Sequence, residues 1–123
     1  MKLLIDTNVL VDQLRGFKSA VAFASALPED TAISVITVAE IHAGVRSEQQ
    51  HNRAAALIET YQILQLDAIS AQMAGHFLRK FAKSHSLDFA DAAIAATAAT
   101  HHLQLITLNT KHFPMFPGLK KPY

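Results

Sequence analysis

Short apolar runs alternate with longer segments of helical periodicity along this chain. The runs are rich in Ile, Val and Leu, and they lie at about residues 2–6, 31–36, 62–66 and 104–107. Each run is nearly continuous rather than alternating with polar residues, which is typical of strands that helices cover on both faces. The pattern therefore predicts four strands of a mainly parallel sheet.

Helical periodicity fills the intervals between these runs. We expect helices at about 8–14, 17–26, 37–47, 49–60, 68–84 and 88–101. The tail "FPMFPGLKKPY" holds three of the four prolines and is expected to be extended or turned, with at most an edge strand near 115–120. The alternation predicts an α/β fold, namely a three-layer α/β/α sandwich around a sheet of about four or five strands.

Composition sets the limits for function. The 123 residues, 50% of them hydrophobic, suffice for one compact core, so we expect a single domain over residues 1–123. The absence of cysteine excludes disulfides, thiolate metal sites and a cysteine nucleophile. There is no secretory signal pattern and no apolar run near the ~18 residues of a membrane span, which favours a cytoplasmic protein. With a net charge of +1, any anionic partner must be held by local basic groups or by a metal ion.

The first apolar run, within "LLIDTN", stops at the carboxylate of Asp6. In an open parallel sheet, ligands bind in the crevice outside the carboxyl ends of the strands. We therefore expect Asp6 at that edge. Its alternative role is the N-cap of the helix that begins near Thr7.

A second acid, Glu40, follows the second run in "SVITVAEIHAGV". The spacing from Thr37 to Glu40 matches a capping box, with Thr37 as N-cap. This interpretation places Glu40 in the first turn of a helix that leaves the carboxyl end of a strand. Glu40 would then share an edge with Asp6.

The third acidic element is "SLDFADAAIAATAATHH". Asp88 and Asp91 are three residues apart, so a helix projects both from one side near its N-terminus. Asp88 can cap this helix, and Asp91 suits its first turn. The alanines that follow allow close packing, which can bring both carboxylates to the same edge.

Carboxylates from three distant segments would repel one another at a shared edge unless a cation neutralises them. Mg²⁺ or Mn²⁺ prefers oxygen ligands and commonly bridges carboxylates to phosphate oxygens. The chemistry predicted from the residues is metal-assisted hydrolysis of a phosphodiester.

Four segments in order resemble one family over essentially the whole chain: "LLIDTNVLVD", "SVITVAEIHAGV", "DFADAAIAATA" and "LQLITLNTKHFPMFPGL". Together they resemble PIN-domain ribonucleases of the VapC toxin type. The resemblance implies a PIN-like fold and an endoribonuclease that depends on Mg²⁺ or Mn²⁺. It also implies an RNA substrate, a cognate VapB-type antitoxin, and a homodimer or a toxin–antitoxin hetero-oligomer. Asp6, Glu40 and Asp91 match the family's acidic positions as catalytic and metal-binding residues, and we add Asp88 to the site.

The fourth segment departs from the family pattern, because "TLNTKHF" contains no carboxylate. Asn109 can still ligate a metal or orient a water, and Thr107 can hydrogen-bond a neighbouring carboxylate. The missing charge predicts a weaker second metal site. Asn8 either helps to hold Asp6 or forms a turn.

Basic residues near the predicted crevice are candidates for contacts with RNA phosphates. His112 and Lys111 follow the fourth strand and should border the crevice. The further candidates, each of which could equally lie on a solvated helix face, are Arg46, Arg79, Lys80 and Lys83.

The alternative function is a response-regulator receiver domain. Asp67 ends the run "ILQL" and could act as the phosphoacceptor, with Lys111 as the accompanying lysine. The simpler interpretation is that Asp67 caps the helix at 68–84. A haloacid-dehalogenase-like phosphatase is disfavoured, because "DTN" lacks a second aspartate two residues after the first.

Overall fold

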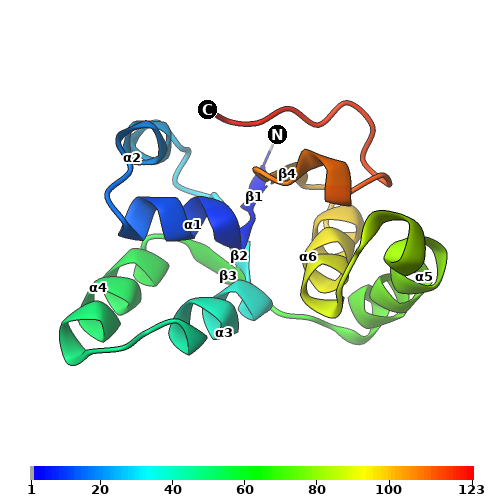
Figure 1. The fold of residues 1–123 in the computed structure, drawn as a ribbon, viewed down its shortest axis with the longest axis horizontal. Coiled ribbons are helices and arrows are strands. Elements are labelled where there is room, and N and C mark those ends of the chain that lie inside the picture. Colours follow the sequence, from blue (N-terminus) through cyan, green and yellow to red (C-terminus); the bar gives the residue numbers. More distant parts are fainter. Residues whose placement is uncertain (1) are drawn as a thin grey trace.

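The structure is a computed structural model that describes residues 2–123, with a parallel sheet between two layers of helices (Figure 1). The strands are β1 (Leu3–Ile5), β2 (Ala32–Ser34), β3 (Gln62–Leu64) and β4 (Gln104–Ile106). Their order in the sheet is β3-β2-β1-β4, and every neighbouring pair is parallel. The predicted three-layer α/β/α sandwich is confirmed.

Within residues 2–123, six α-helices connect the strands and one 3₁₀-helix follows the last strand. The α-helices are α1 (Thr7–Leu14), α2 (Lys18–Ser25), α3 (Val35–Ala43), α4 (Glu48–Glu59), α5 (Ala68–His85) and α6 (Phe89–Thr100), and the 3₁₀-helix is η1 (Thr110–His112). Within residues 2–123, no helix is both long enough and apolar enough to cross a membrane. The edge strand considered near 115–120 does not form in the described part of the chain, where that segment consists of turns and irregular backbone.

Alternate residues of the strands face opposite layers of helices. Leu4 and Leu105 belong to the core formed with α5 and α6, whereas Ile5 and Ile106 belong to the core formed with α1, α3 and α4. Side chains of a strand alternate between the two faces of a sheet, so a strand covered on both faces is apolar at consecutive positions. This arrangement explains the continuous apolar runs.

The transition from β2 to α3 differs from the prediction. Ser34, rather than Thr37, is the N-cap, because its hydroxyl accepts the N–H of Ile36 at 3.0 Å. The predicted capping box is therefore wrong: Thr37 is buried inside α3, and Glu40 lies in the second turn of the helix rather than the first. The β-branched run after Ser34 favours a strand by propensity, and the hydroxyl cap with its tertiary surroundings overrides that preference.

Candidate active site

The strand order reverses between β1 and β4. Strands β2 and β3 extend the sheet on one side of β1, and β4 pairs with its other side. The loops that leave two such strands diverge and form a crevice at their carboxyl ends. Asp6 follows β1 and Thr107 follows β4, and both are buried. The Thr107 hydroxyl donates a hydrogen bond to Oδ2 of Asp6 at 2.7 Å, which joins the two strand ends.

Asp6 combines the two roles that its sequence position suggested. It is the N-cap of α1, with its Oδ1 accepting the N–H of Thr7 at 2.8 Å, and it lies at the strand edge with 4% of its surface exposed. Burial raises the pKa of Asp6, and the charges of Glu40 and Asp88 raise it further. The hydrogen bonds from Thr107 and Thr7 act in the opposite direction and lower the pKa.

Thr107 uses its full hydrogen-bonding capacity at the site. Its hydroxyl donates to Asp6 and accepts from the Asn109 N–H at 3.0 Å and from Nδ2 of Asn8 at 3.4 Å. The Asn8 side-chain oxygen in turn accepts the N–H of Leu108 at 3.3 Å. A hydroxyl offers one proton and two lone pairs, so this arrangement leaves none of them unused. Asn8 and Thr107 thereby fix the loop after β4 against the start of α1.

Glu40 is connected to the start of α1 by the hydroxyl of Thr7, which also contacts the hydroxyl of Thr37. The Thr7 hydroxyl donates to Oε1 of Glu40 at 2.6 Å and lies 2.9 Å from the hydroxyl of Thr37. Since the single Thr7 proton goes to Glu40, Thr37 is the donor to Thr7. Sequence reasoning did not find these two hydroxyl roles, because it assigned Thr37 to a helix cap. The sequence did contain a signal for these roles, because Thr7 lies shortly after β1 and Thr37 lies shortly after the neighbouring strand β2.

Asp88 and Asp91 occupy the N-terminus of α6 as predicted. Asp88 is the N-cap, and its Oδ1 accepts the N–H of Asp91 at 2.8 Å. Burial, together with the charges of Asp88 and Asp6, raises the pKa of Asp91 from its usual 3.8 to about 6. Asp91 is therefore close enough to Asp6 for the two carboxylates to repel each other, although they belong to different ends of the sequence.

His112 is the cationic candidate that approaches the acids. Its Nδ1 lies 3.8 Å from Oδ2 of Asp91, which is beyond hydrogen-bonding distance. This Nδ1 atom is buried and has no hydrogen-bond partner within residues 2–123. A buried polar atom without a partner calls for a water, an ion or a ligand group beside it. Lys111, by contrast, is exposed and forms no ion pair with a carboxylate of the described chain.

The structure brings the other three predicted acids, Glu40, Asp88 and Asp91, within electrostatic reach of Asp6 without arranging the four as a complete metal site. Among residues 2–123, no three His, Asp or Glu side chains form a group that could hold a metal ion. No Lys or Arg nitrogen of the same residues lies within 4.0 Å of a carboxylate oxygen. Mg²⁺ often keeps several waters and takes only one or two carboxylates directly. The oxygen donors and the uncompensated negative charge therefore suit a hydrated Mg²⁺ or Mn²⁺ ion better than a cation held entirely by protein ligands.

The remaining candidates fall outside this cluster or at its rim. Asn109 is bound through its N–H to Thr107, and the residue is exposed. Asp67 is the N-cap of α5 and accepts the N–H of Ser70 at 2.8 Å, so its simpler interpretation is the correct one. That hydrogen bond is the main cause of a lowered pKa for Asp67.

Comparisons with known proteins agree over nearly the whole chain. Residues 3–117 match the family described as PIN domain. The chain is 37% identical to Ribonuclease VapC19 of Mycobacterium tuberculosis, covering 98% of each protein. It is 36% identical to Ribonuclease VapC10 of the same species, covering 98% of this chain and 92% of that protein. A chain of a solved toxin-antitoxin complex from Klebsiella pneumoniae superposes with a TM-score of 0.84 at 35% identity, covering 98% of each chain.

Proposed function

The chain belongs to the PIN domain family, and on that premise we propose that it is an endoribonuclease toxin neutralised by a cognate antitoxin. The relatives named ribonucleases share more than a third of its residues over almost their full length. Membership of this family replaces the alternative of a receiver domain with Asp67 as phosphoacceptor.

The observation that carries the proposal is the buried carboxylate of Asp6 at the point where the strand order reverses. It is hydrogen-bonded to Thr107, and acids from α3 and α6 lie within electrostatic reach of it. Burying charge without a cationic partner is unfavourable, so a fold that keeps such a cluster needs a compensating ligand. A divalent cation with a phosphodiester is the ligand that this chemistry favours.

Mg²⁺, or Mn²⁺ in its place, would be held by Asp6 and Asp91, with Glu40 and Asp88 contributing through coordinated waters. When bound, it would supply an activated water and stabilise negative charge on the phosphate. The chain's own residues keep the acids in position. Thr107 holds the carboxylate of Asp6 in one orientation, and the N–H of Thr7 favours its ionised form.

His112 is the residue best placed to meet the phosphate. Its unpartnered Nδ1 faces Asp91 from the loop after β4, which borders the crevice. An imidazole N–H at this point can donate a hydrogen bond to a phosphate oxygen. In this arrangement His112 orients the substrate and leaves the acids to the cation.

Cleavage of RNA by the purified chain tests the proposed activity. The substrate is a mixture of labelled transfer, ribosomal and messenger RNA, incubated with Mg²⁺ and, separately, with EDTA. We expect cleavage that needs the metal and that Asp6→Asn or Asp91→Asn abolishes. The matched control is Asp67→Asn, which makes the same chemical change at a helix cap outside the cluster. Cleavage that survives Asp6→Asn, or that only Asp67→Asn abolishes, would contradict the proposal.

The antitoxin is proposed from relatives that were solved within toxin-antitoxin complexes. Expression of the chain alone should arrest growth, and co-expression of the neighbouring open reading frame should restore it. The Asp6→Asn variant should not arrest growth under either condition. Arrest by this variant would show that toxicity does not depend on the acidic cluster, which consists of Asp6, Glu40, Asp88 and Asp91.

A further inference from the structure

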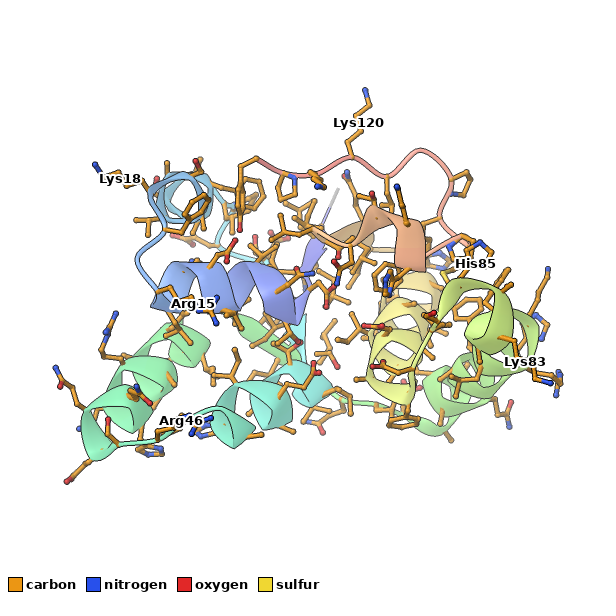
Figure 2. The ribbon with its side chains drawn as sticks, in the orientation of Figure 1. Arg15, Lys18, Arg46, Lys83, His85 and Lys120 are labelled. Atoms are coloured by element: carbon orange, nitrogen blue, oxygen red, sulfur yellow. The ribbon has the colours of Figure 1, made fainter. Side chains whose placement is uncertain are left out.

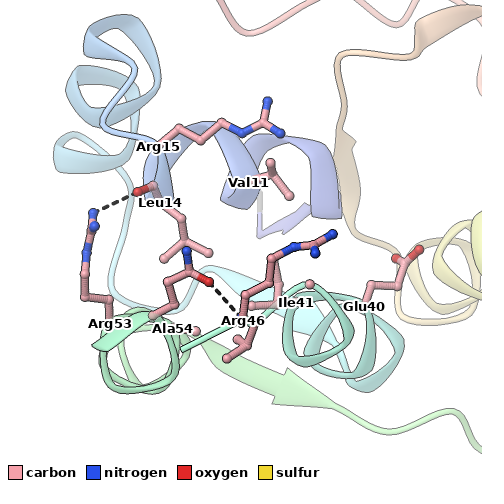
Figure 3. A pocket seen from close by; sticks show the side chains of 11 residues that line it. Val11, Leu14, Arg15, Glu40, Ile41, Arg46, Arg53 and Ala54 are labelled. Carbon is pink, nitrogen blue, oxygen red and sulfur yellow. Dashed lines mark hydrogen bonds between the residues drawn. The ribbon is translucent and has the colours of Figure 1, made fainter. Parts of the chain in front are cut away.

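A cavity of about 590 Å³ lies between α1, α3 and α4, beside the acidic cluster (Figure 3). Its apolar wall includes Val11, Ile41 and Val45. Three arginines line it from three segments, Arg15 at the end of α1, Arg46 in the connection from α3 to α4, and Arg53 in α4. A volume of this size lies within the usual range for a small-ligand site. We call this site the arginine cavity.

Two of the three guanidinium groups have no partner within residues 2–123. Arg53 donates from Nη2 to the carbonyl oxygen of Leu14 at 2.8 Å, so it ties α4 to the end of α1. The guanidinium groups of Arg15 and Arg46 make no side-chain hydrogen bond and no ion pair with a carboxylate among the residues described. Figure 3 shows the Arg15 side chain extending over the cavity from the end of α1 and the Arg46 side chain extending over it from the connection between α3 and α4. Two unpaired guanidinium groups over one hollow form a site for an anion.

The arginine cavity shares a wall with the candidate active site. Glu40 lines the cavity and also accepts the hydrogen bond from Thr7, the residue that follows Asp6. A polymer chain bound at the acids therefore reaches the cavity by passing Glu40. The cavity, which is partly open to solvent, is therefore available to the next unit of that polymer.

We propose that the arginine cavity binds a nucleotide of the RNA strand that flanks the cleaved phosphodiester, an inference that rests on the proposed nuclease function. Arg15 and Arg46 would bind its phosphate, since a planar guanidinium pairs with phosphate oxygens through two parallel hydrogen bonds. The apolar wall would receive the flat face of the base. The site would thereby hold the strand in register with the acids and select the base next to the cut.

The distribution of the other basic groups favours this cavity over the rest of the surface. The net charge of +1 provides no general attraction for RNA. Lys83 and His85 belong to α5, on the far side of the sheet from Arg15 and Arg46 (Figure 2). Arg79 also lies on α5, with Nη2 3.4 Å from a ring nitrogen of His76. Of the four basic residues that the sequence offered for phosphate contacts outside the loop after β4, Arg46 is the one that lines this cavity.

Methyl NMR of the full chain, labelled at Ile and Val, tests the proposal without any need for catalysis. The probes are 5′-phosphorylated tri-uridine and tri-adenosine RNA, added in EDTA so that cleavage cannot occur. We expect saturable shifts at the methyl groups of Ile41 and Val45. The double variant Arg15→Gln/Arg46→Gln should weaken binding at least about tenfold, and Arg46→Lys should weaken it less because it keeps the charge but loses the planar fork.

Arg79→Gln removes the same charge outside the cavity and should leave binding unchanged. Arg15 and Arg46 are both exposed, so we expect their variants to fold. Methyl signals outside the cavity that keep their native positions would verify this directly. Shifts that are absent from the cavity, or that persist in the double variant, would overturn the proposal. A hexaglutamate peptide that binds the cavity more tightly than either RNA would also overturn it, in favour of an acidic protein segment. None of these outcomes affects the nuclease function itself, which is tested separately by metal-dependent RNA cleavage and its sensitivity to Asp6→Asn.

Discussion

Thr107 donates a 2.7 Å hydrogen bond to Asp6 across a separation of 101 residues in the sequence. The two residues directly follow the neighbouring strands β1 and β4, and both are buried. This bond fixes one carboxylate oxygen, while the N–H of Thr7 fixes the other. The position of Asp6 is therefore set by the fold before any substrate binds.

Thr107→Val should destabilise the fold by about 1–2 kcal/mol, because the shape is kept while a buried carboxylate oxygen loses its donor. The substitution should also raise the pKa of Asp6 further, since the Thr107 hydrogen bond lowers it. Urea unfolding at pH 7 measures the first effect. Thr107→Ser keeps the hydroxyl and is the matched control. Equal stability of the Val variant and the native chain would show that the bond does not stabilise the fold.

Asp91→Asn should stabilise the metal-free fold at neutral pH. The folded-state pKa of Asp91 is about 6, above its ordinary value of 3.8, so ionisation is harder in the folded state than in the unfolded chain. The native chain therefore loses stability relative to the variant as the pH rises from about 4 through about 6. We expect a difference on the order of 1 kcal/mol above pH 7, allowing for solvent screening. It should vanish below pH 4 in unfolding curves recorded with EDTA.

Asp67→Asn provides a control with the opposite sign. The pKa of Asp67 is lowered by its hydrogen bond to Ser70, so its charge favours the folded state above the unfolded pKa. The native chain should be the more stable of the two at neutral pH, and the difference should shrink as the pH falls below 4. Parallel pH trends for the two variants would mean that the pH response does not arise from these local environments.

The acidic cluster also predicts a response to Mg²⁺. An ion that binds the folded state alone stabilises it, by about 2.7 kcal/mol at a concentration of 100 times its Kd. Binding should weaken as the pH falls below about 6, because a protonated Asp91 must release its proton to become a ligand. Calorimetric titration of the native chain, Asp6→Asn and Asp91→Asn measures this, with Asp67→Asn as control. Equal Mg²⁺ affinity in all four proteins would place the ion elsewhere.

Much of the fold could be predicted from the pattern of apolar residues. Strands covered on both faces must be apolar at consecutive positions, and this requirement located all four of them. The order of the strands could not be predicted, because β1 to β4 are similar short runs and any of them could pair with another. The start of α3 was misplaced because a single hydroxyl, that of Ser34, decides it against the strand preference of the next three residues.

The candidate site was predictable to the extent that it depends on strand and helix ends. Asp6 and Asp88 are caps whose positions follow from local sequence, and parallel strands bring such ends to one edge. The hydroxyl link from Thr37 through Thr7 to Glu40 and the arginine cavity depend on how α1, α3 and α4 pack. Contacts between distant helices leave no periodic signal in a single sequence.

A separate set of contacts fastens the end of the chain to the first two helices. The Tyr123 hydroxyl donates to Oδ2 of Asp12 at 2.7 Å, and the Tyr123 ring lies 5.8 Å from that of Phe17 and 6.1 Å from that of Phe23, centroid to centroid. Burial is the main cause of a raised pKa for Tyr123. Figure 1 shows the last segment running across the molecule toward α2. We infer that Tyr123 holds α2 in place from outside its own stretch of sequence.

Tyr123→Phe should cost about 1 kcal/mol through loss of the hydrogen bond to Asp12. Tyr123→Ala should cost about 2 kcal/mol or more, since it also removes the aromatic contacts with α2. Hydrogen exchange should then become faster in residues 18–25 than in the rest of the core.

Tyr61→Phe is the matched control. The Tyr61 hydroxyl donates to Oε1 of Gln13 on α1 at 2.7 Å, and the aromatic pairs with Phe17 and Phe23 are made by Tyr123 and not by Tyr61. It should lower stability without selectively exposing α2. Equal exchange rates in α2 for Tyr123→Ala and Tyr61→Phe would show that the C-terminal contact does not hold this helix.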